Sequence, residues 1–216
     1  MNQNFNLEKF FSKSSTEEEI PKLVHAEYDF AVAYPPPETI PLEGLVEGLA
    51  DGLLREGRDL AYYPDVLGAF SMRKLVSGKL KEDRGINVSP DEIMITQGSA
   101  EANNLFIQTL TDPGDTVITE EFVYVGTLRQ LRRAKADVVG SKLDKDGLIP
   151  EELEVLIKNL RSQGKNIKFV YTIPEFQNPT GSTLPLDRRI RILKILEKYG
   201  IPLLEDDCYV DLRFEG

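Results

Sequence analysis

The sequence contains little of the chemistry that marks secreted, metal-binding or membrane-spanning proteins. With one cysteine, Cys208, it cannot form an internal disulfide, so we expect a reducing compartment. The sequence has one histidine and one cysteine, and this number of ligands gives little support for a transition-metal site. No apolar run approaches the roughly 20 residues that span a bilayer, and residues 1–15 hold no apolar core of signal-peptide length. These absences predict a cytoplasmic protein with no membrane partner.

Positive charge is also scarce. The 26 lysines and arginines are outnumbered by 36 aspartates and glutamates, which gives a net charge of −10. Nucleic-acid binding normally shows a basic stripe, whereas Arg129, Arg132 and Arg133 follow helical spacing, as a solvated helix face does. We therefore expect no nucleic-acid partner. With 216 residues, of which 41% are hydrophobic, the chain can form one ordinary globular domain with a small appendage.

The first 40 residues differ in pattern from the rest. They are irregular and end in Tyr34-Pro35-Pro36-Pro37, where consecutive prolines exclude helix and sheet. From Pro41 the apolar residues recur at three- and four-residue steps, which predicts a helix, and a second helix carries Met72 and Leu75 and ends near Gly85. We expect an N-terminal arm with a small-domain portion over residues 1–40 and a large domain over 41–216.

Short apolar runs then alternate with helical segments. The runs predict strands at 93–96, 116–119, 136–143, 167–173 and 201–204, and the helical pattern covers 100–110, 127–134, a segment from Pro150, and 186–199. Apolar strands separated by helices predict an α/β fold with a mostly parallel sheet. In such sheets ligands bind beyond the carboxyl ends of the strands, so the residues that follow each strand are the candidates for a site.

The first two strand ends carry ambiguous candidates. Gln97-Gly98-Ser99-Ala100 opens a helix whose amino end, with the Ser99 hydroxyl, can hold an anion, although a plain glycine turn with a helix cap fits as well. Tyr124 follows the next strand, where its ring could stack on a flat cofactor or fill the core.

Two more strand ends carry polar groups. Asn178-Pro179-Thr180-Gly181 is a turn by its chemistry, and it presents an amide that can donate to a ligand. Glu205, Asp206 and Asp207 would repel one another at the end of a buried strand unless a cation lies nearby. That cation could be a divalent metal or the protonated nitrogen of a heterocycle.

The ordered set Gly-Ser-Ala, Tyr-Val-Gly-Thr-Leu, Asn-Pro-Thr-Gly and Asp-Asp-Cys-Tyr resembles fold type I enzymes that use pyridoxal 5'-phosphate (PLP), aminotransferase class I/II. The resemblance covers the chain from about Phe30 to its last residue and is closest to the aromatic, branched-chain and 2-aminoadipate subgroup. It implies the large domain of a three-layer sandwich with an N-terminal arm. It also implies transfer of an amino group between an amino acid and a 2-oxo acid.

The resemblance assigns a role to each motif. Ser99 and the backbone N–H of Ala100 would hold the cofactor phosphate, and Tyr124 would stack on the pyridine ring. Asp206 would pair with the ring nitrogen, in preference to Asp207, because the family places this carboxylate three residues before a tyrosine.

Three further residues complete the implied site. Asn178 and Tyr209 would hydrogen-bond the phenolic oxygen of the cofactor. Tyr63 resembles the tyrosine that reaches the phosphate of a neighbouring subunit, so the resemblance implies a homodimer with shared sites.

Two departures from the family pattern leave other functions open. Val32-Ala33 stands where the subgroup has a Gly-Gly pair beside the substrate, and no Schiff-base lysine follows Asp206. We therefore expect a fragment or truncated product that is inactive on its own. The alternatives are a PLP-dependent carbon–sulfur lyase, or a non-catalytic remnant or regulator domain with the same fold, although no basic helix-turn-helix precedes Phe30.

Overall fold

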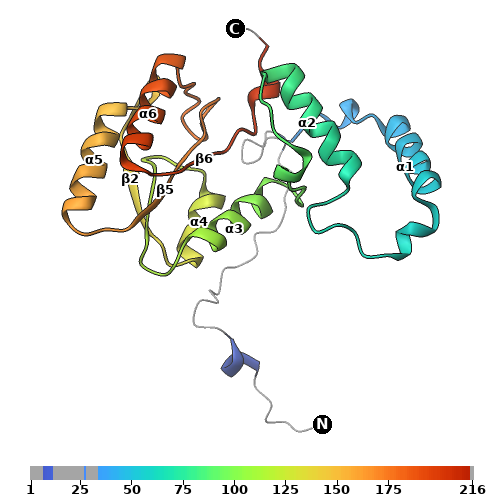
Figure 1. The fold of residues 1–216 in the computed structure, drawn as a ribbon, viewed down its shortest axis with the longest axis horizontal. Coiled ribbons are helices and arrows are strands. Elements are labelled where there is room, and N and C mark those ends of the chain that lie inside the picture. The colour runs from blue at the N-terminus through green and yellow to red at the C-terminus, as the bar shows by residue number, and fades with distance from the viewer. Residues whose placement is uncertain (1–6, 12–26, 28–33, 215–216) are drawn as a thin grey trace. The chain divides into compact units, whose positions relative to one another are not determined.

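The computed structural model describes residues 7–11, 27 and 34–214 and forms two compact units, Met1–Ile95 and Thr96–Gly216 (Figure 1). Each unit is described by itself. Most of the predicted N-terminal arm, including the Val32-Ala33 departure, lies outside the described residues. The predicted domain boundary at residue 40 stays a prediction.

The first unit is helical in its described part. Its elements are η1 (Leu7–Phe10), η2 (Pro37–Thr39), α1 (Leu42–Glu56), η3 (Gly57–Ala61), α2 (Phe70–Arg84) and η4 (Pro90–Glu92). Both predicted helices form, and α2 ends at Gly85, which adopts the left-handed conformation that glycine tolerates best. The apolar stripe of α1 forms as expected, yet no residue of this helix is buried.

The second unit contains a four-stranded parallel sheet in the described part of the chain. Its strands, in spatial order, are β2 (Asp137–Ser141), β1 (Thr116–Glu120), β5 (Ile167–Thr172) and β6 (Leu203–Glu205). Helix α3 (Ser99–Leu110) precedes β1, and η5 (Val210–Leu212) follows β6. The helices between the strands are α4 (Val125–Arg133), α5 (Pro150–Ser162) and α6 (Leu186–Tyr199). The predicted α/β fold with a mostly parallel sheet is confirmed.

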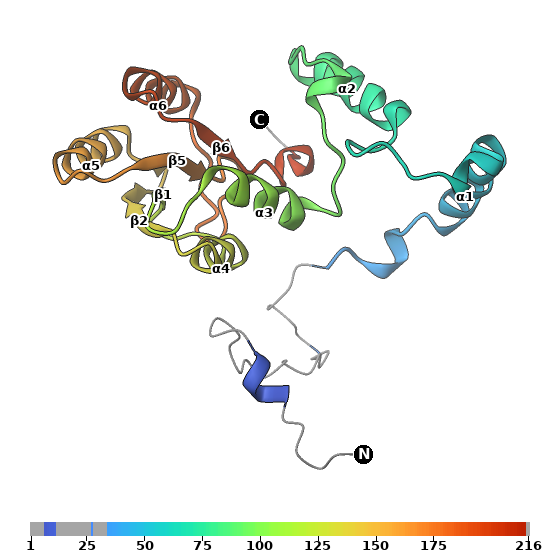
Figure 2. The same ribbon diagram turned by 60° about the horizontal axis from the view of Figure 1, so that its bottom comes forward.

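Helices cover both faces of this sheet (Figures 1 and 2). Ile118 and Val170 point to one face, where they pack in a core cluster with residues of α5 and α6. Their strand neighbours Val117 and Phe169 belong to a second cluster with α3 and α4. Successive side chains of a strand point to opposite faces, so two adjacent apolar residues supply both cores. This is why the strands read as continuous apolar runs.

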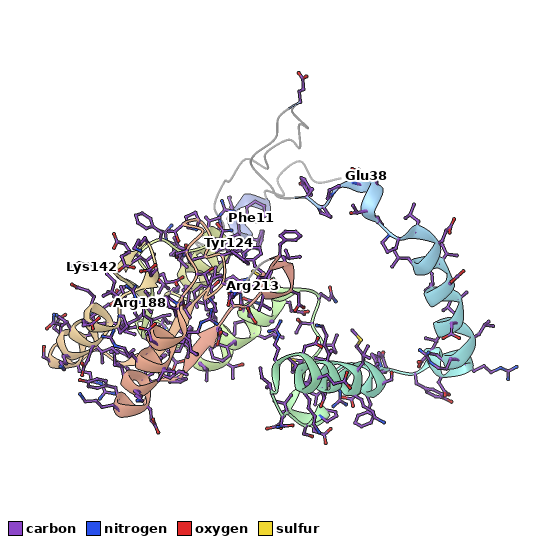
Figure 3. The ribbon with its side chains drawn as sticks, turned by 90° about the horizontal axis from the view of Figure 1, so that it is seen from above. Phe11, Glu38, Tyr124, Lys142, Arg188 and Arg213 are labelled. Carbon is purple, nitrogen blue, oxygen red and sulfur yellow. The ribbon has the colours of Figure 1, made fainter. Side chains whose placement is uncertain are left out.

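A short antiparallel hairpin was not expected. The run predicted as one strand over 136–143 divides into β2 and β3 (Leu143–Asp144), and β3 pairs with β4 (Gly147–Leu148). Arg188 lies near the start of α6 and is labelled in Figure 3. It donates to both carboxylate oxygens of Asp144 at 2.7 Å and so ties the hairpin to the helix. The hydrogen bonds from Arg188 hold the pKa of Asp144 at about 2.

The predicted strand at 93–96 is wrong. Ile93 has extended backbone angles, as its apolar run suggests, but the segment has no hydrogen-bonded strand neighbour in the described part of the chain. A backbone hydrogen bond to a distant part of the same chain runs from the Ile95 N–H to the Leu67 carbonyl at 2.9 Å. An apolar run predicts an extended backbone, but a strand also needs a partner, and no local pattern specifies one.

Candidate functional site

Three of the four candidate segments leave the same edge of one sheet. Because β1, β5 and β6 run parallel, the residues that follow Glu120, Thr172 and Glu205 all start from the carboxyl edge. The fourth segment was expected to follow a strand ending at Thr96, and that strand is not formed. Its helix α3 nevertheless begins at Ser99, as predicted.

Ser99 and Asp206 line one open pocket of about 390 Å³ between α3 and the end of β6. The lining residues are Ser99, Ala102, Asn103, Phe106, Leu204, Glu205, Asp206, Asp207 and Cys208. None of these described residues is a lysine. The pocket therefore combines a helix amino end and a hydroxyl on one side with carboxylates on the other.

The chain enters α3 through Gly98, whose φ of 85° and ψ of 169° suit only glycine. This turn sets Ser99 and Ala100 in the first turn of the helix, where backbone N–H groups have no helical partner. The Ala100 carbonyl accepts a hydrogen bond from Gln130 Nε2 at 2.7 Å, which joins the start of α3 to α4.

Asp206 is held by groups from two other elements. Its Oδ2 accepts hydrogen bonds from the Tyr171 hydroxyl at 2.8 Å and from Asn103 Nδ2 at 3.0 Å. Its backbone N–H donates to the Thr172 carbonyl at 2.9 Å, which continues the pairing of β6 with β5. The Tyr171 hydroxyl in turn accepts from Thr127 Oγ1 at 3.1 Å. The direction of the Asp206 carboxylate is therefore fixed directly from α3 and β5, and α4 supports it only through Tyr171.

Tyr171 is fully buried, and burial, with the negative charge of Asp206, raises the pKa of its hydroxyl above the usual value. It stays a neutral donor to Asp206. Neither Tyr171 nor Asn103 was predicted as a site residue. Asn103 could have been found, because it lies four residues after Ser99 and so on the same face of α3. Nothing in the strand pattern distinguishes Tyr171 from an ordinary core aromatic.

Both Asp206 and Asp207 line the pocket. Because β6 ends at Glu205, the alternation of side chains along a strand does not separate the two carboxylates. They differ in that Asp206 accepts the hydrogen bonds from Tyr171 and Asn103. Within the described residues, no group of three or more His, Cys, Asp or Glu side chains is placed to hold a metal ion.

Asn178 and Tyr209 lie close enough for the Asn178 side chain to act on the Tyr209 hydroxyl. Asn178 lies in the turn after β5, where the Asn178–Pro179 peptide bond is cis, and Tyr209 precedes η5. Burial raises the pKa of the Tyr209 hydroxyl, and the nearby Asn178 side chain acts against that rise. The structure thus brings together the two residues that were expected to contact the same cofactor oxygen.

Tyr124 caps the start of α4 after β1 and keeps a partly exposed ring. The ring lies over Gly126, where an added Cβ would be 2.4 Å from Tyr124 Cε1. Gly126 therefore permits a close approach that no other residue would allow at this ring position.

Tyr63 belongs to the first unit, and its side chain is fully exposed. The turn after it is fixed by Arg73, a buried arginine that donates to Asp65 Oδ2 at 2.8 Å and to the Gly68 carbonyl at 3.0 Å. Because Tyr63 and the pocket residues belong to different units, its role stays a prediction.

In the described part of the chain, no helix is long and apolar enough to cross a membrane. This finding covers the described residues alone.

Comparison with known proteins gives a consistent family. The model of "Aminotransferase class I and II" matches residues 26–216. Aromatic-amino-acid aminotransferase 1 of Thermococcus litoralis is 32% identical, over 97% of this chain and 52% of the relative. The 2-aminoadipate transaminase of Thermus thermophilus is also 32% identical, over 86% of this chain and 44% of the relative.

Solved structures agree with the family model. The kynurenine aminotransferase of Pyrococcus horikoshii, solved in complex with PMP, is 32% identical and superposes with a TM-score of 0.85. That match covers 98% of this chain and 54% of the solved chain. The chain thus spans about half the length of the relatives that it matches. With a family model matched over most of its residues, the chain is a member of the class I and II aminotransferases.

Proposed function

We propose that this chain contributes the cofactor site of a PLP-dependent aminotransferase that moves an amino group between an amino acid and a 2-oxo acid. The observation that carries the proposal is the pocket shared by Ser99 and Asp206, in which the Asp206 carboxylate is fixed by Tyr171 and Asn103. Family membership supports the reaction type, and the relatives' names suggest aromatic or 2-aminoadipate-like substrates.

The donors and acceptors of the pocket fit PLP. A phosphate suits the amino end of α3, where Ser99 and the Ala100 N–H can donate. A protonated pyridine nitrogen suits Asp206, a carboxylate at the other side of the same pocket. When bound, PLP withdraws electrons from the substrate carbon that loses its proton.

In this proposal Asp206 keeps a proton on the ring nitrogen. Its carboxylate must be correctly directed to do so, and the hydrogen bonds from Tyr171 and Asn103 fix that direction. Asn178 and Tyr209 bind the phenolic oxygen as a pair, and the Tyr124 ring stacks on the pyridine.

The remaining assignments rest on the family resemblance. Tyr63 reaches the phosphate of a neighbouring subunit, so the protein acts as a homodimer. Its full exposure is compatible with a contact to a second copy. The cytoplasmic location stays a prediction from the single cysteine.

The test is a cofactor titration followed by an assay with and without a 2-oxo acid. We expect the purified 216-residue chain, or any longer product of its gene, to bind PLP, and Ser99→Ala and Asp206→Ala to weaken that binding. In an active product a transaminase needs the 2-oxo acid, whereas a carbon–sulfur lyase releases ammonia without it. Failure of every product to bind PLP would refute the proposal.

A further inference from the structure

The buried side chain of Gln177 joins two loops that leave the same edge of the sheet. Its Nε2 donates to the Phe122 carbonyl at 2.6 Å, in the loop between β1 and α4, and to Glu120 Oε2 at 3.1 Å. Its Oε1 accepts from the Thr180 N–H at 2.9 Å and the Thr180 hydroxyl at 2.7 Å, in the loop between β5 and α6. Gln177 is only 2% exposed. Both donors and both acceptor sites of its amide are therefore used.

The amide fits in one orientation. A flip would turn its oxygen toward the Phe122 and Glu120 oxygens and its NH₂ group toward the N–H of Thr180. The backbone of Gln177 closes the same turn, since its N–H donates to the Ser182 carbonyl at 2.8 Å and its carbonyl accepts from the Gly181 N–H at 2.6 Å. Asn178 lies inside this turn.

Glu120 connects the pair of loops to the sheet. It is the last residue of β1 and is 2% exposed, and burial raises the pKa of its carboxyl group. It accepts from Thr172 Oγ1 at 2.7 Å and from the Ile173 N–H at 3.3 Å, both at the end of β5. Through Glu120, the position of Gln177 is fixed relative to both β1 and β5 and not only to its own loop.

We propose that Gln177 is a positioning residue that sets the Tyr124 loop and the Asn178 loop relative to the sheet, with Glu120 as its anchor. Phe122 is two residues before Tyr124, and Gln177 immediately precedes Asn178. The consequence for the cofactor rests on the proposed function, in which Tyr124 and Asn178 hold the same ring. The mechanical coupling of the two loops does not depend on it.

Hydrogen exchange on the purified full-length protein tests the coupling. Gln177→Leu keeps the size of the side chain and removes all four hydrogen bonds. We expect amides in residues 121–128 and 177–183 to exchange about tenfold faster, because buried partners lose their bonds, while α5 is unchanged. The matched control is Gln108→Leu, whose exposed amide donates only to Asn104 within α3. Faster exchange confined to 177–183 would overturn the coupling.

Milder variants keep the test valid if Gln177→Leu does not fold. Thr180→Val removes the hydroxyl that donates to Gln177 and that also bonds to Ser182 within its own loop. We therefore expect a smaller acceleration, about threefold, and the exchange of residues 121–128 is the informative measurement. Glu120→Gln keeps an acceptor and should preserve protection, whereas Glu120→Leu should behave like Gln177→Leu. Equal loosening by both Glu120 variants would refute the anchor role, because the conservative variant must rescue it.

Cofactor affinity separates this inference from the proposed function. In a PLP titration we expect the Kd to rise about tenfold in Gln177→Leu and to stay unchanged in Gln108→Leu. If the parent protein binds no PLP, the proposed function fails while the exchange result still decides the coupling. If the parent binds PLP and the Kd of Gln177→Leu is unchanged, the positioning role is refuted.

Discussion

Tyr171 and Asp206 are 35 residues apart in the sequence, and their hydrogen bond at 2.8 Å helps to fix the direction of the Asp206 carboxylate in the candidate site. Glu120 and Gln177 form a second buried pair at the same sheet edge. In both pairs a neutral donor faces a carboxylate, and the buried carboxylate of Glu120 would be costly without such donors. Replacing one of these carboxylates by the amide of the same shape can therefore separate the effect of its charge from the effect of its shape.

At Asp206 we expect Asp206→Asn to reduce activity far more than Asp207→Asn in any active product of the gene. An asparagine keeps the shape but cannot hold the ring nitrogen in its protonated form, so the loss should appear in kcat. Measured kcat values and the absorbance spectrum of the bound cofactor provide the check. Equal losses in both variants would mean that the ring nitrogen faces another carboxylate.

At Glu120 we expect Glu120→Gln to change the pH dependence of stability. Burial raises the pKa of the Glu120 carboxyl group, so the folded state favours its neutral form. For an acid with a raised folded pKa, stability is greatest below the unfolded pKa of about 4.3 and falls as pH rises through the folded pKa. The variant should therefore be at least as stable as the parent at pH 7, with its relative advantage shrinking toward pH 4. Urea unfolding at both values measures this, and an advantage that grows on acidification would contradict it.

At the scale of elements, the amino end of α3 depends on how the chain enters it. Gly98 adopts angles that only glycine tolerates, and a Cβ there would meet no other atom within 4 Å. The requirement is therefore one of backbone conformation and not of space. By contrast, α1 contains Gly44, Gly48 and Gly52 in helical positions with equally open surroundings.

We expect Gly98→Ala to destabilise the protein by about 1–3 kcal/mol and to weaken PLP binding, because it strains the turn that presents Ser99. Gly48→Ala, the control, should instead stabilise the protein by about 0.5–1 kcal/mol, since alanine is the better helix former. Chemical denaturation and PLP titration of both variants measure these effects. If Gly98→Ala changed neither the stability nor the PLP binding, the turn could relax to accommodate alanine.

At the scale of the whole molecule, the pocket proposed for the cofactor and the lysine that the reaction needs must be considered separately. No lysine lines the Ser99–Asp206 pocket among the described residues, and the chain spans about half the length of its relatives. Binding of PLP and catalysis are therefore separate questions for this chain.

We expect the 216-residue chain by itself to show no transaminase activity and no covalent attachment of PLP to a lysine. The reaction needs a lysine that binds the cofactor and moves the substrate proton, and none of the described residues that line the pocket is a lysine. Borohydride reduction followed by peptide mapping is the measurement. A mapped PLP-lysine in this chain would show the expectation to be wrong.

The sequence by itself determined the alternation of strands and helices, the order of the four motifs and the family. These depend on local properties: the spacing of apolar residues, the turn chemistry of Gly and Pro, and the residues that follow each strand. Helix α6 lies at its predicted bounds for that reason, ended by Gly200.

Only the tertiary structure decided which segments become neighbours. It left 93–96 without a strand neighbour among the described residues, although these residues favour a strand. It also joined Asn103 to Asp206 across 103 residues and the Gln177 amide to the Phe122 carbonyl across 55. A hydrogen bond between distant side chains depends on how helices and strands pack, and a local pattern carries no record of that packing. Asp206 was therefore predictable from the end of β6, whereas Tyr171, which holds its carboxylate in place, was not.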